Sequence, residues 1–194
     1  MIGATANANE PVDKNILILG DSLSAGLGVN YDQAWPSLLQ SRINKIGASY
    51  RVINAGVSGD TTSGGISRLP RLLKKYSPEI LILELGGNDG LRGTSLKAIE
   101  KNLRDMINSA QSNDITVILI GVQLPPNYGV LYTEGFENIF SDLAKEYSLG
   151  LIQGSLKTMV NEGLMQSDGI HPNVPGHRQI ESIVWELLKK YLEK

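Results

Sequence analysis

The chain has 194 residues, a formal net charge of −2 and no cysteine. This length fits one domain with a sizeable core. The small net charge gives no electrostatic case for nucleic acid or an anionic membrane as a partner, and the lack of cysteine excludes disulfides, thiolate catalysis and cysteine-ligated metals. Because no apolar run approaches the roughly 20 residues of a membrane span, we expect a globular protein without a transmembrane segment.

The N-terminal residues 1–14 are expected to be a flexible segment outside the fold. Small residues at Ala4, Ala6 and Ala8 resemble the end of a secretory signal peptide, although the basic and apolar parts of such a signal are missing. Two interpretations stay open, a processed exported protein and a simple flexible tail. Residues 15–194 are expected to form the single domain.

The rest of the chain alternates between apolar runs and segments of helical periodicity. Short apolar runs predict buried strands at residues 15–20, 50–54, 79–84, 115–121 and 149–152. Apolar residues at helical spacing predict helices at residues 34–45, 63–76, 96–113, 132–147 and 175–192. Regular alternation of buried strands and helices predicts a three-layer α/β/α fold with a doubly wound, parallel, five-stranded sheet.

In such sheets the working site lies at the carboxyl ends of the strands. The loop after the first predicted strand carries Ser22, which is a nucleophile only if a base activates it. Taken alone, it is more typical of a turn or cap serine. The chain has two histidines. His171 follows Asp168 by three residues, a spacing that suits either a catalytic pair or a structural one. His177, among polar neighbours, is expected on the surface.

The loops after the second and third predicted strands carry Gly59 and Asn88. The Gly59 N–H, the Asn88 amide and the Ser22 N–H are candidate donors to the oxyanion of an acyl-transfer reaction. Each of these loops taken alone also reads as an ordinary turn. No group of side chains has the spacing of metal ligands, so we expect no metal and no cofactor.

Taken together, these segments resemble the SGNH (GDSL) hydrolase superfamily. The resemblance rests on Gly20-Asp-Ser-Leu-Ser24, on Gly59, on Gly-Gly-Asn-Asp through Asn88, and on Asp168-Gly-Ile-His-Pro172, and it covers residues 15 to about 190. It implies a flavodoxin-like sheet and a catalytic triad of Ser22, His171 and Asp168. It also implies an oxyanion hole formed by Ser22, Gly59 and Asn88.

Further segments, such as Glu84–Gly93 and Leu124–Gly129, resemble a bacterial group of periplasmic esterases and thioesterases with broad specificity. This resemblance implies small ester and thioester substrates, among them aryl esters, acyl-CoA and lysophospholipids. It also implies a monomer in the periplasm or outside the cell, with a cytoplasmic location left open. The residues expected to contact the substrate are Asp21, Leu23, Leu91, Leu124, Pro125, Pro126, Asn127, Tyr128 and Ile170.

Two other functions remain open from the sequence. A carbohydrate O-acetylesterase of the same superfamily would share the catalytic residues, although the apolar Leu91, Leu124 and Pro125 favour acyl chains. A non-catalytic, flavodoxin-like binding module would share the fold, but it leaves the Asp168–His171 pair unexplained and the phosphate-binding motifs are absent. Residues 45–49 and 154–163 match the bacterial group less well, which leaves the acyl preference open.

Overall fold

A parallel sheet of five strands forms the centre of the protein. The computed structural model describes residues 14–154, 159 and 162–192, so the expected flexible segment lies outside the described residues except for Lys14. The strands are β1 (Lys14–Gly20), β2 (Tyr50–Asn54), β3 (Ile80–Glu84), β4 (Thr116–Ile120) and β5 (Gly150–Ile152). Their order, β2-β1-β3-β4-β5, is that of flavodoxin-like folds and confirms the predicted fold class.

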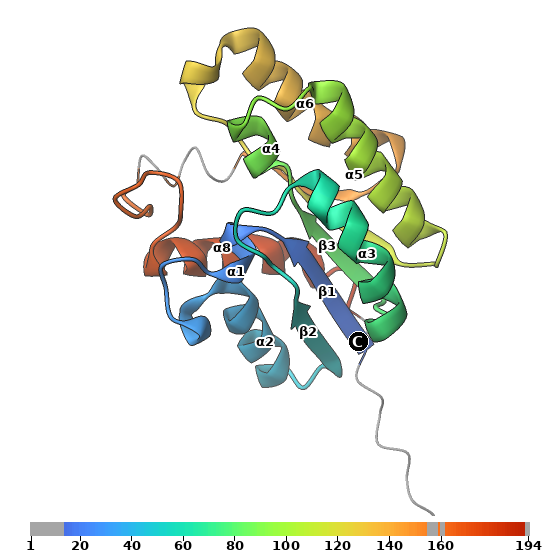
Figure 1. The fold of residues 1–194 in the computed structure, drawn as a ribbon. Helices are drawn as coiled ribbons and strands as arrows, with labels where there is room; N and C mark the ends of the chain where they lie inside the picture. Colours follow the sequence, from blue (N-terminus) through green and yellow to red (C-terminus); the bar gives the residue numbers. More distant parts are fainter. Residues whose placement is uncertain (1–13, 155–158, 160–161, 193–194) are drawn as a thin grey trace, which may run out of the picture.

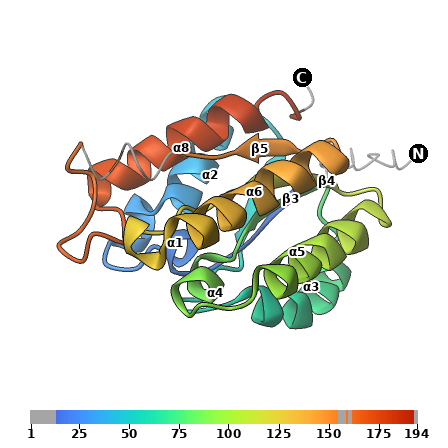
Figure 2. The ribbon, with the colours of Figure 1, turned by 90° about the horizontal axis from the view of Figure 1, so that it is seen from above.

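Helices cover both faces of the sheet and produce the three layers seen in Figures 1 and 2. On one face lie α2 (Trp35–Lys45) and α8 (Val174–Leu188); on the other lie α3 (Thr62–Tyr76), α5 (Leu96–Gln111) and α6 (Val130–Glu146). Strand β1 shows why two layers are needed, because Ile16 and Ile18 point into one core while Leu17 and Leu19 point into the other. None of the helices in the described part of the chain is long and apolar enough to cross a membrane.

The predicted strands and helices agree with the structure to within two residues at most of their ends. The last helix is the exception, because it ends at Leu188, after which the backbone folds into turns. Four short elements were expected as loops: the helices α1 (Ser22–Ala25) and α4 (Gly87–Leu91) and the 3-10 turns η1 (Tyr31–Gln33) and η2 (Pro126–Tyr128). Both short helices begin directly beyond strand ends at the carboxyl edge of the sheet.

The expected surface position of His177 is wrong. Its side chain is fully buried between α8 and α2, where Nδ1 accepts a hydrogen bond of 3.3 Å from the Trp35 N–H. An accepting Nδ1 places the ring proton on Nε2. Burial, assisted by the nearby His171, lowers the pKa of His177 to about 4. The polar residues next to His177 in the sequence lie on other faces of α8, so their polarity does not indicate whether His177 is buried.

Buried His177 should make the protein sensitive to acid. The unfolded chain takes up a proton near the ordinary pKa of 6.5, whereas the folded protein takes it up only near 4. The neutral ring therefore contributes stability above about pH 6.5 that is lost as the pH falls towards 4. His177→Asn keeps an acceptor for Trp35 but does not titrate. Between pH 7 and pH 4 its Tm should fall less than that of the wild type; parallel curves would contradict the assignment.

Candidate active site

Ser22 is the first residue of α1, directly after the tight turn that follows β1. Asp21 is the N-cap of α1, and its Oδ1 accepts a hydrogen bond of 3.1 Å from the Leu23 N–H. The residue before it must be small, because a Cβ on Gly20 would lie 2.3 Å from Ser24 Oγ and 2.7 Å from Glu84 Oε2. This close packing of strand, turn and helix fixes the backbone of Ser22 at the carboxyl edge of the sheet.

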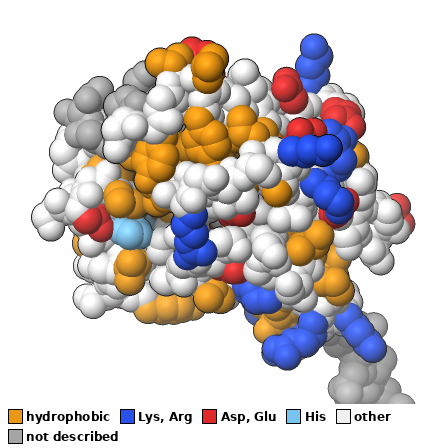
Figure 3. Space-filling model, turned by 45° about the horizontal axis from the view of Figure 1, so that its top comes forward, with side chains coloured by type: hydrophobic (Ala, Val, Ile, Leu, Met, Phe, Trp, Pro, Cys, Tyr) orange, Lys and Arg blue, Asp and Glu red, His pale blue; other side chains and the backbone are white. Residues whose placement is uncertain are grey.

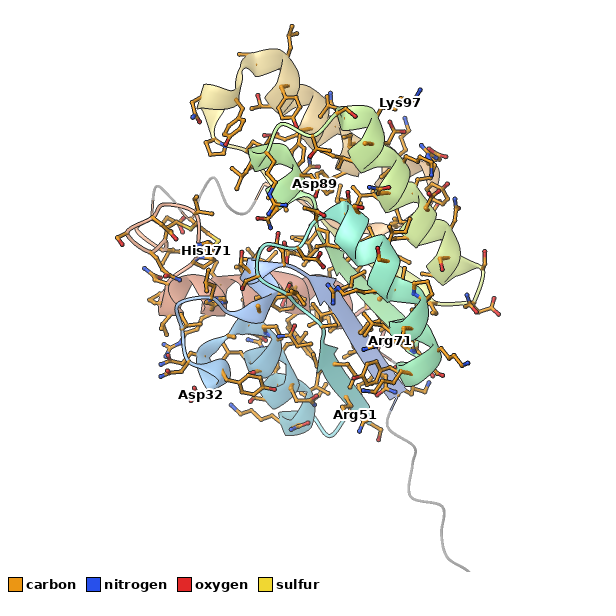
Figure 4. The ribbon with its side chains drawn as sticks, in the orientation of Figure 1. Asp32, Arg51, Arg71, Asp89, Lys97 and His171 are labelled. Atoms are coloured by element: carbon orange, nitrogen blue, oxygen red, sulfur yellow. The ribbon has the colours of Figure 1, made fainter. Side chains whose placement is uncertain are left out.

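The hydroxyl of Ser22 meets His171, which lies 149 residues further along the chain. The distance between Ser22 Oγ and His171 Nε2 is 2.9 Å, and that between His171 Nδ1 and Asp168 Oδ2 is 2.6 Å. Figure 4 shows His171 in the segment that precedes α8. The three residues therefore stand in the order serine, histidine, aspartate. In this order the imidazole can remove the serine proton while the carboxylate holds the ring.

Asp168 is held as an acceptor by three donors. Besides His171 Nδ1, its carboxylate accepts hydrogen bonds from the backbone N–H groups of Ile170, at 2.9 Å, and His171, at 3.0 Å. The hydrogen bond from the His171 ring, together with the two backbone bonds, lowers the pKa of Asp168 to about 2. The carboxylate of Asp168 is therefore ionised at neutral pH and can only accept. In the neutral imidazole this places the proton on Nδ1 and leaves Nε2 free to accept a proton.

The three candidate oxyanion donors lie beyond the carboxyl ends of the three neighbouring strands β2, β1 and β3. Asn88 is in α4, and one of its two amide hydrogens is bound by Asp21 Oδ2 at an Nδ2–O distance of 3.0 Å. In the described part of the chain, the N–H groups of Ser22 and Gly59 donate no hydrogen bond. Gly59 has a φ of +79°, a conformation that favours glycine. These donors remain available for an oxygen atom of a ligand.

Two buried carboxyl groups, those of Asp21 and Glu84, lie behind Ser22, and the sequence did not predict the burial of either. Burial raises the pKa of Asp21 to about 6, although the hydrogen bonds from Leu23 and Asn88 act in the opposite direction. Glu84 is 1% exposed at the end of β3, and its Oε2 accepts from Ser24 Oγ at 2.7 Å and from the Asp21 N–H at 3.3 Å. Burial, and then the charge of Asp21, raises the pKa of Glu84.

A third buried carboxylate, Asp89, holds α4 in place. It is 2% exposed and accepts from the Thr62 N–H at 2.8 Å and from Thr62 Oγ1 at 2.7 Å. Figure 4 shows Asp89 where α4 meets the start of α3. Because Asn88 precedes Asp89 in the chain, this attachment restricts where the Asn88 amide can lie. The sequence shows that Asn88 and Asp89 are adjacent, but it does not indicate which of the two side chains is buried.

The residues expected to contact the substrate differ in where they lie: some pack around α4, some are exposed, and two are buried. Leu91 and Tyr128 are brought together by a 3.0 Å hydrogen bond from the Tyr128 hydroxyl to the Leu91 carbonyl, and Leu124 packs closely against Gly90. Ile170 is 47% exposed beside His171, and Pro125 and Asn127 are exposed. Asp21 and Leu23 are buried behind Ser22. The side chain of Pro126 lies outside the described residues.

Hydrophobic side chains gather on the face that carries the site, around the histidine visible in Figure 3. A separate apolar cavity of about 10 Å³ lies between Leu23, next to Ser22, and α8. It has room for about one water molecule rather than an acyl chain. Its lining consists of Leu23, Ile120, Gly121, Val122, Ile152, Ile180, Ile183 and Val184. Among the described residues, no group of three or more potential ligand side chains is placed to hold a metal ion.

Comparison with known proteins gives consistent matches over nearly the whole chain. Residues 18–179 match the model of the GDSL-like lipase/acylhydrolase family. Esterase TesA of Pseudomonas aeruginosa is 42% identical over 92% of this chain and 90% of its own length. Thioesterase 1/protease 1/lysophospholipase L1 of Escherichia coli K12 is 39% identical over 92% and 83%, respectively. The crystal structure of the psychrotrophic esterase EstA from Pseudoalteromonas sp., inhibited by monoethylphosphonate, is 34% identical, covers 92% of this chain and 98% of that one, and superposes with a TM-score of 0.87.

Proposed function

Because the chain belongs to the GDSL-like lipase/acylhydrolase family, we propose that it hydrolyses carboxylic esters and acyl thioesters through an acyl-enzyme on Ser22. The observation that carries this proposal is the continuous contact from Ser22 Oγ to His171 Nε2, at 2.9 Å, and from His171 Nδ1 to Asp168 Oδ2, at 2.6 Å. These are the distances at which a histidine can act as a general base.

In the first half of the reaction, Ser22 Oγ attacks the carbonyl carbon of the substrate while its proton passes to His171 Nε2. Asp168 keeps the charged imidazole in place and stabilises its charge. The carbonyl oxygen becomes an anion, which the N–H groups of Ser22 and Gly59 and the Asn88 amide are placed to bind. Cleavage of the C–O or C–S bond then releases an alcohol or a thiol, which takes the proton from His171.

In the second half, water replaces the leaving group. His171 Nε2 removes a proton from the water, whose oxygen attacks the acyl carbon of the Ser22 ester. The second tetrahedral intermediate forms in the same oxyanion hole. Its collapse returns the proton to Ser22 Oγ and releases the carboxylic acid. His171 passes the first proton to the leaving alcohol or thiol and the second back to Ser22 Oγ, so the protons balance without a cofactor.

Asp21 supports this cycle from behind the nucleophile. One of its oxygens holds the Leu23 N–H of the nucleophile turn, and the other holds the Asn88 amide. Because one amide hydrogen of Asn88 is fixed in this way, the direction of the second is fixed too. A donor whose direction is set before the substrate arrives needs no reorganisation when the oxyanion forms. We therefore assign Asp21 to the positioning of Asn88 rather than to contact with the substrate.

Replacing Asn88 by alanine should lower kcat by about 10²- to 10³-fold, or roughly 3 to 4 kcal/mol, with little change in KM. The amide binds the anionic oxygen of the transition state more strongly than the nearly neutral carbonyl of the substrate. Asn15→Ala is the matched control, because the Asn15 amide donates to the Tyr76 carbonyl at the opposite end of β1. Steady-state kinetics should show wild-type kcat for this control.

Asn88→Asp is the sharper form of the same experiment. Aspartate suits a turn as well as asparagine does, so a structural role would tolerate it. Next to Asp21, however, the new carboxyl group either carries a charge that repels the oxyanion or uses its single proton on Asp21. In both states a donor is lost, and this variant should be at least as slow as Asn88→Ala. Near-normal kcat with a normal Tm would require other oxyanion donors.

A substrate panel tests the reaction itself. We expect hydrolysis of p-nitrophenyl esters, of acyl-CoA and of lysophospholipid. The rates should depend on acyl-chain length, because Leu91 lies in α4 with Asn88, and Leu124 and Tyr128 contact α4. Hydrolysis of acetylated xylan without activity on longer acyl chains would favour the carbohydrate O-acetylesterase instead. No activity on any ester or thioester would contradict the proposed function.

We also propose that residues 15–194 act as one monomeric domain in the periplasm or outside the cell. Support comes from the single sheet with a core on each face and from the signal-like residues near the N-terminus. Cell fractionation, with size-exclusion chromatography of the purified protein, tests these points. Recovery with cytoplasmic markers, or elution as a stable dimer, would contradict them.

A further inference from the structure

The catalytic base lies in a hairpin that is mostly exposed. Residues 167–170 are exposed, and Asp168 and His171 are separated from the nucleophile by about 150 positions of the chain. An isolated bridge between Met165 and Pro172 closes the hairpin. The alignment of Ser22 Oγ and His171 Nε2 therefore depends on whatever attaches this hairpin to the rest of the protein.

Leu164 and Met165 pack against the core beneath α8, and Gln166 attaches the hairpin to the loop beside Ser22. Its backbone N–H donates to the His171 carbonyl at 2.7 Å, across the hairpin. Its side-chain Nε2 donates to the Pro172 carbonyl at 2.8 Å and to the Leu27 carbonyl at 2.7 Å. Both hydrogens of one planar amide are thus used on two segments of the protein, the base hairpin and the loop that follows the nucleophile helix.

The loop that receives this contact is itself bound to the nucleophile. The Leu27 N–H donates to the Ser22 carbonyl at 3.1 Å. Gly28 follows with a φ of +82°, and a Cβ at this position would lie 2.2 Å from Gln166 Oε1. The loop therefore has a glycine where the Gln166 side chain comes close. Hydrogen bonds run from Ser22 through Leu27 and Gln166 to His171.

We propose that Gln166 is a positioning residue that fixes the Asp168–His171 hairpin against the nucleophile loop and so sets the distance between Ser22 Oγ and His171 Nε2. The role of this distance in turnover rests on the function proposed above. Catalysis between held groups is very sensitive to their placement, and a shift of about 1 Å can cost roughly 100-fold. Gln166 acts through His171 and does not touch the reacting atoms.

Gln166→Met tests the proposal, because methionine is similar in length but has no donor for the two carbonyls. We expect kcat for a p-nitrophenyl ester to fall by about 10- to 100-fold with KM little changed. Gln40→Met is the matched control. The Gln40 amide also joins two segments, since it accepts from the Val52 N–H at 2.6 Å and donates to the Tyr50 carbonyl at 3.1 Å, but it attaches α2 to β2.

The control variant should lose a similar amount of Tm and keep wild-type kcat at an assay temperature well below both Tm values. In a His171→Ala background, Gln166→Met should cause no further loss, because its effect passes through His171. A kcat within twofold of wild type for Gln166→Met, or an equal loss for Gln40→Met, would overturn the proposal.

A second readout does not depend on turnover. The ¹⁵N shift of His171 Nε2 reports its hydrogen bond with Ser22 Oγ, and it should change in Gln166→Met and stay unchanged in Gln40→Met. An unchanged shift in Gln166→Met would overturn the positioning role even if kcat falls in this variant. A changed shift in a protein that hydrolyses no ester would leave the positioning role standing and count against the proposed function alone.

Discussion

Ser22→Ala should lower kcat for ester hydrolysis by about 10⁴- to 10⁶-fold while the protein folds normally. The loss is large because alanine has no atom that can form the acyl-enzyme, and His171 then has no proton to accept. The fold should persist because Ser22 is the first residue of α1 and the cap is supplied by Asp21. Burst and steady-state kinetics with a p-nitrophenyl ester, alongside circular dichroism, measure both expectations.

Ser24→Ala is the control for this experiment. Ser24 lies two residues further along the same helix, but it is buried and its hydroxyl donates to Glu84. Its loss removes a partner from a buried carboxyl group, which lowers stability, but it leaves the Ser22–His171 contact in place. A Ser24 variant that is inactive but folded, beside an active Ser22 variant, would move the nucleophile to Ser24.

His171→Ala should cause a loss of similar size, about 10⁴- to 10⁶-fold in kcat, because serine and histidine act as one unit. For the same reason the double variant Ser22→Ala/His171→Ala should be no slower than either single variant. General-base catalysis requires an unprotonated base, so the activity of the wild type should fall in acid. Asp168 does not cause this loss, since the hydrogen bond from His171 lowers its pKa to about 2.

His177 provides the control within the same chain. It is buried against Trp35 and, at neutral pH, should contribute to stability alone. His177→Asn should therefore keep the kcat and the acid limb of the wild type when assayed below its Tm. A His171 variant with near-normal turnover, or a His177 variant that loses it, would contradict the assignment of the base.

The sequence was sufficient to predict the sheet, because its strands depend on local patterns, and short motifs marked the segments of the candidate site. The apolar run Ile16–Leu19, for example, predicts a strand by itself, and it lies within β1 in the structure. The helices α1 and α4 were not predicted, since their residues have no apolar periodicity. Helix α4 (Gly87–Leu91) begins after Gly86 at a φ of +117° and is held by the contacts of Asp89 with Thr62. Contacts of this kind leave no local pattern.

Burial of polar residues was the other source of error. Glu84 ends an apolar run in a way that would equally suit a strand reaching solvent, yet it is 1% exposed beneath the nucleophile turn. His177 has polar neighbours in sequence, but α8 turns it towards α2. No short sequence pattern around Gln166 indicates its role. Its importance appears only when the base hairpin and the Leu27 loop are placed side by side. Such roles depend on distant packing, which one sequence does not encode in any short pattern.

The central claim is an acyl-enzyme on Ser22, and its most direct test is covalent labelling with an aryl phosphonate followed by peptide mass spectrometry. We expect one adduct per chain, on the peptide that contains Ser22, with activity lost in proportion to labelling. Labelling should be abolished in Ser22→Ala and strongly slowed in His171→Ala. An adduct on Ser24 or Ser58, or full turnover after stoichiometric labelling, would contradict the account.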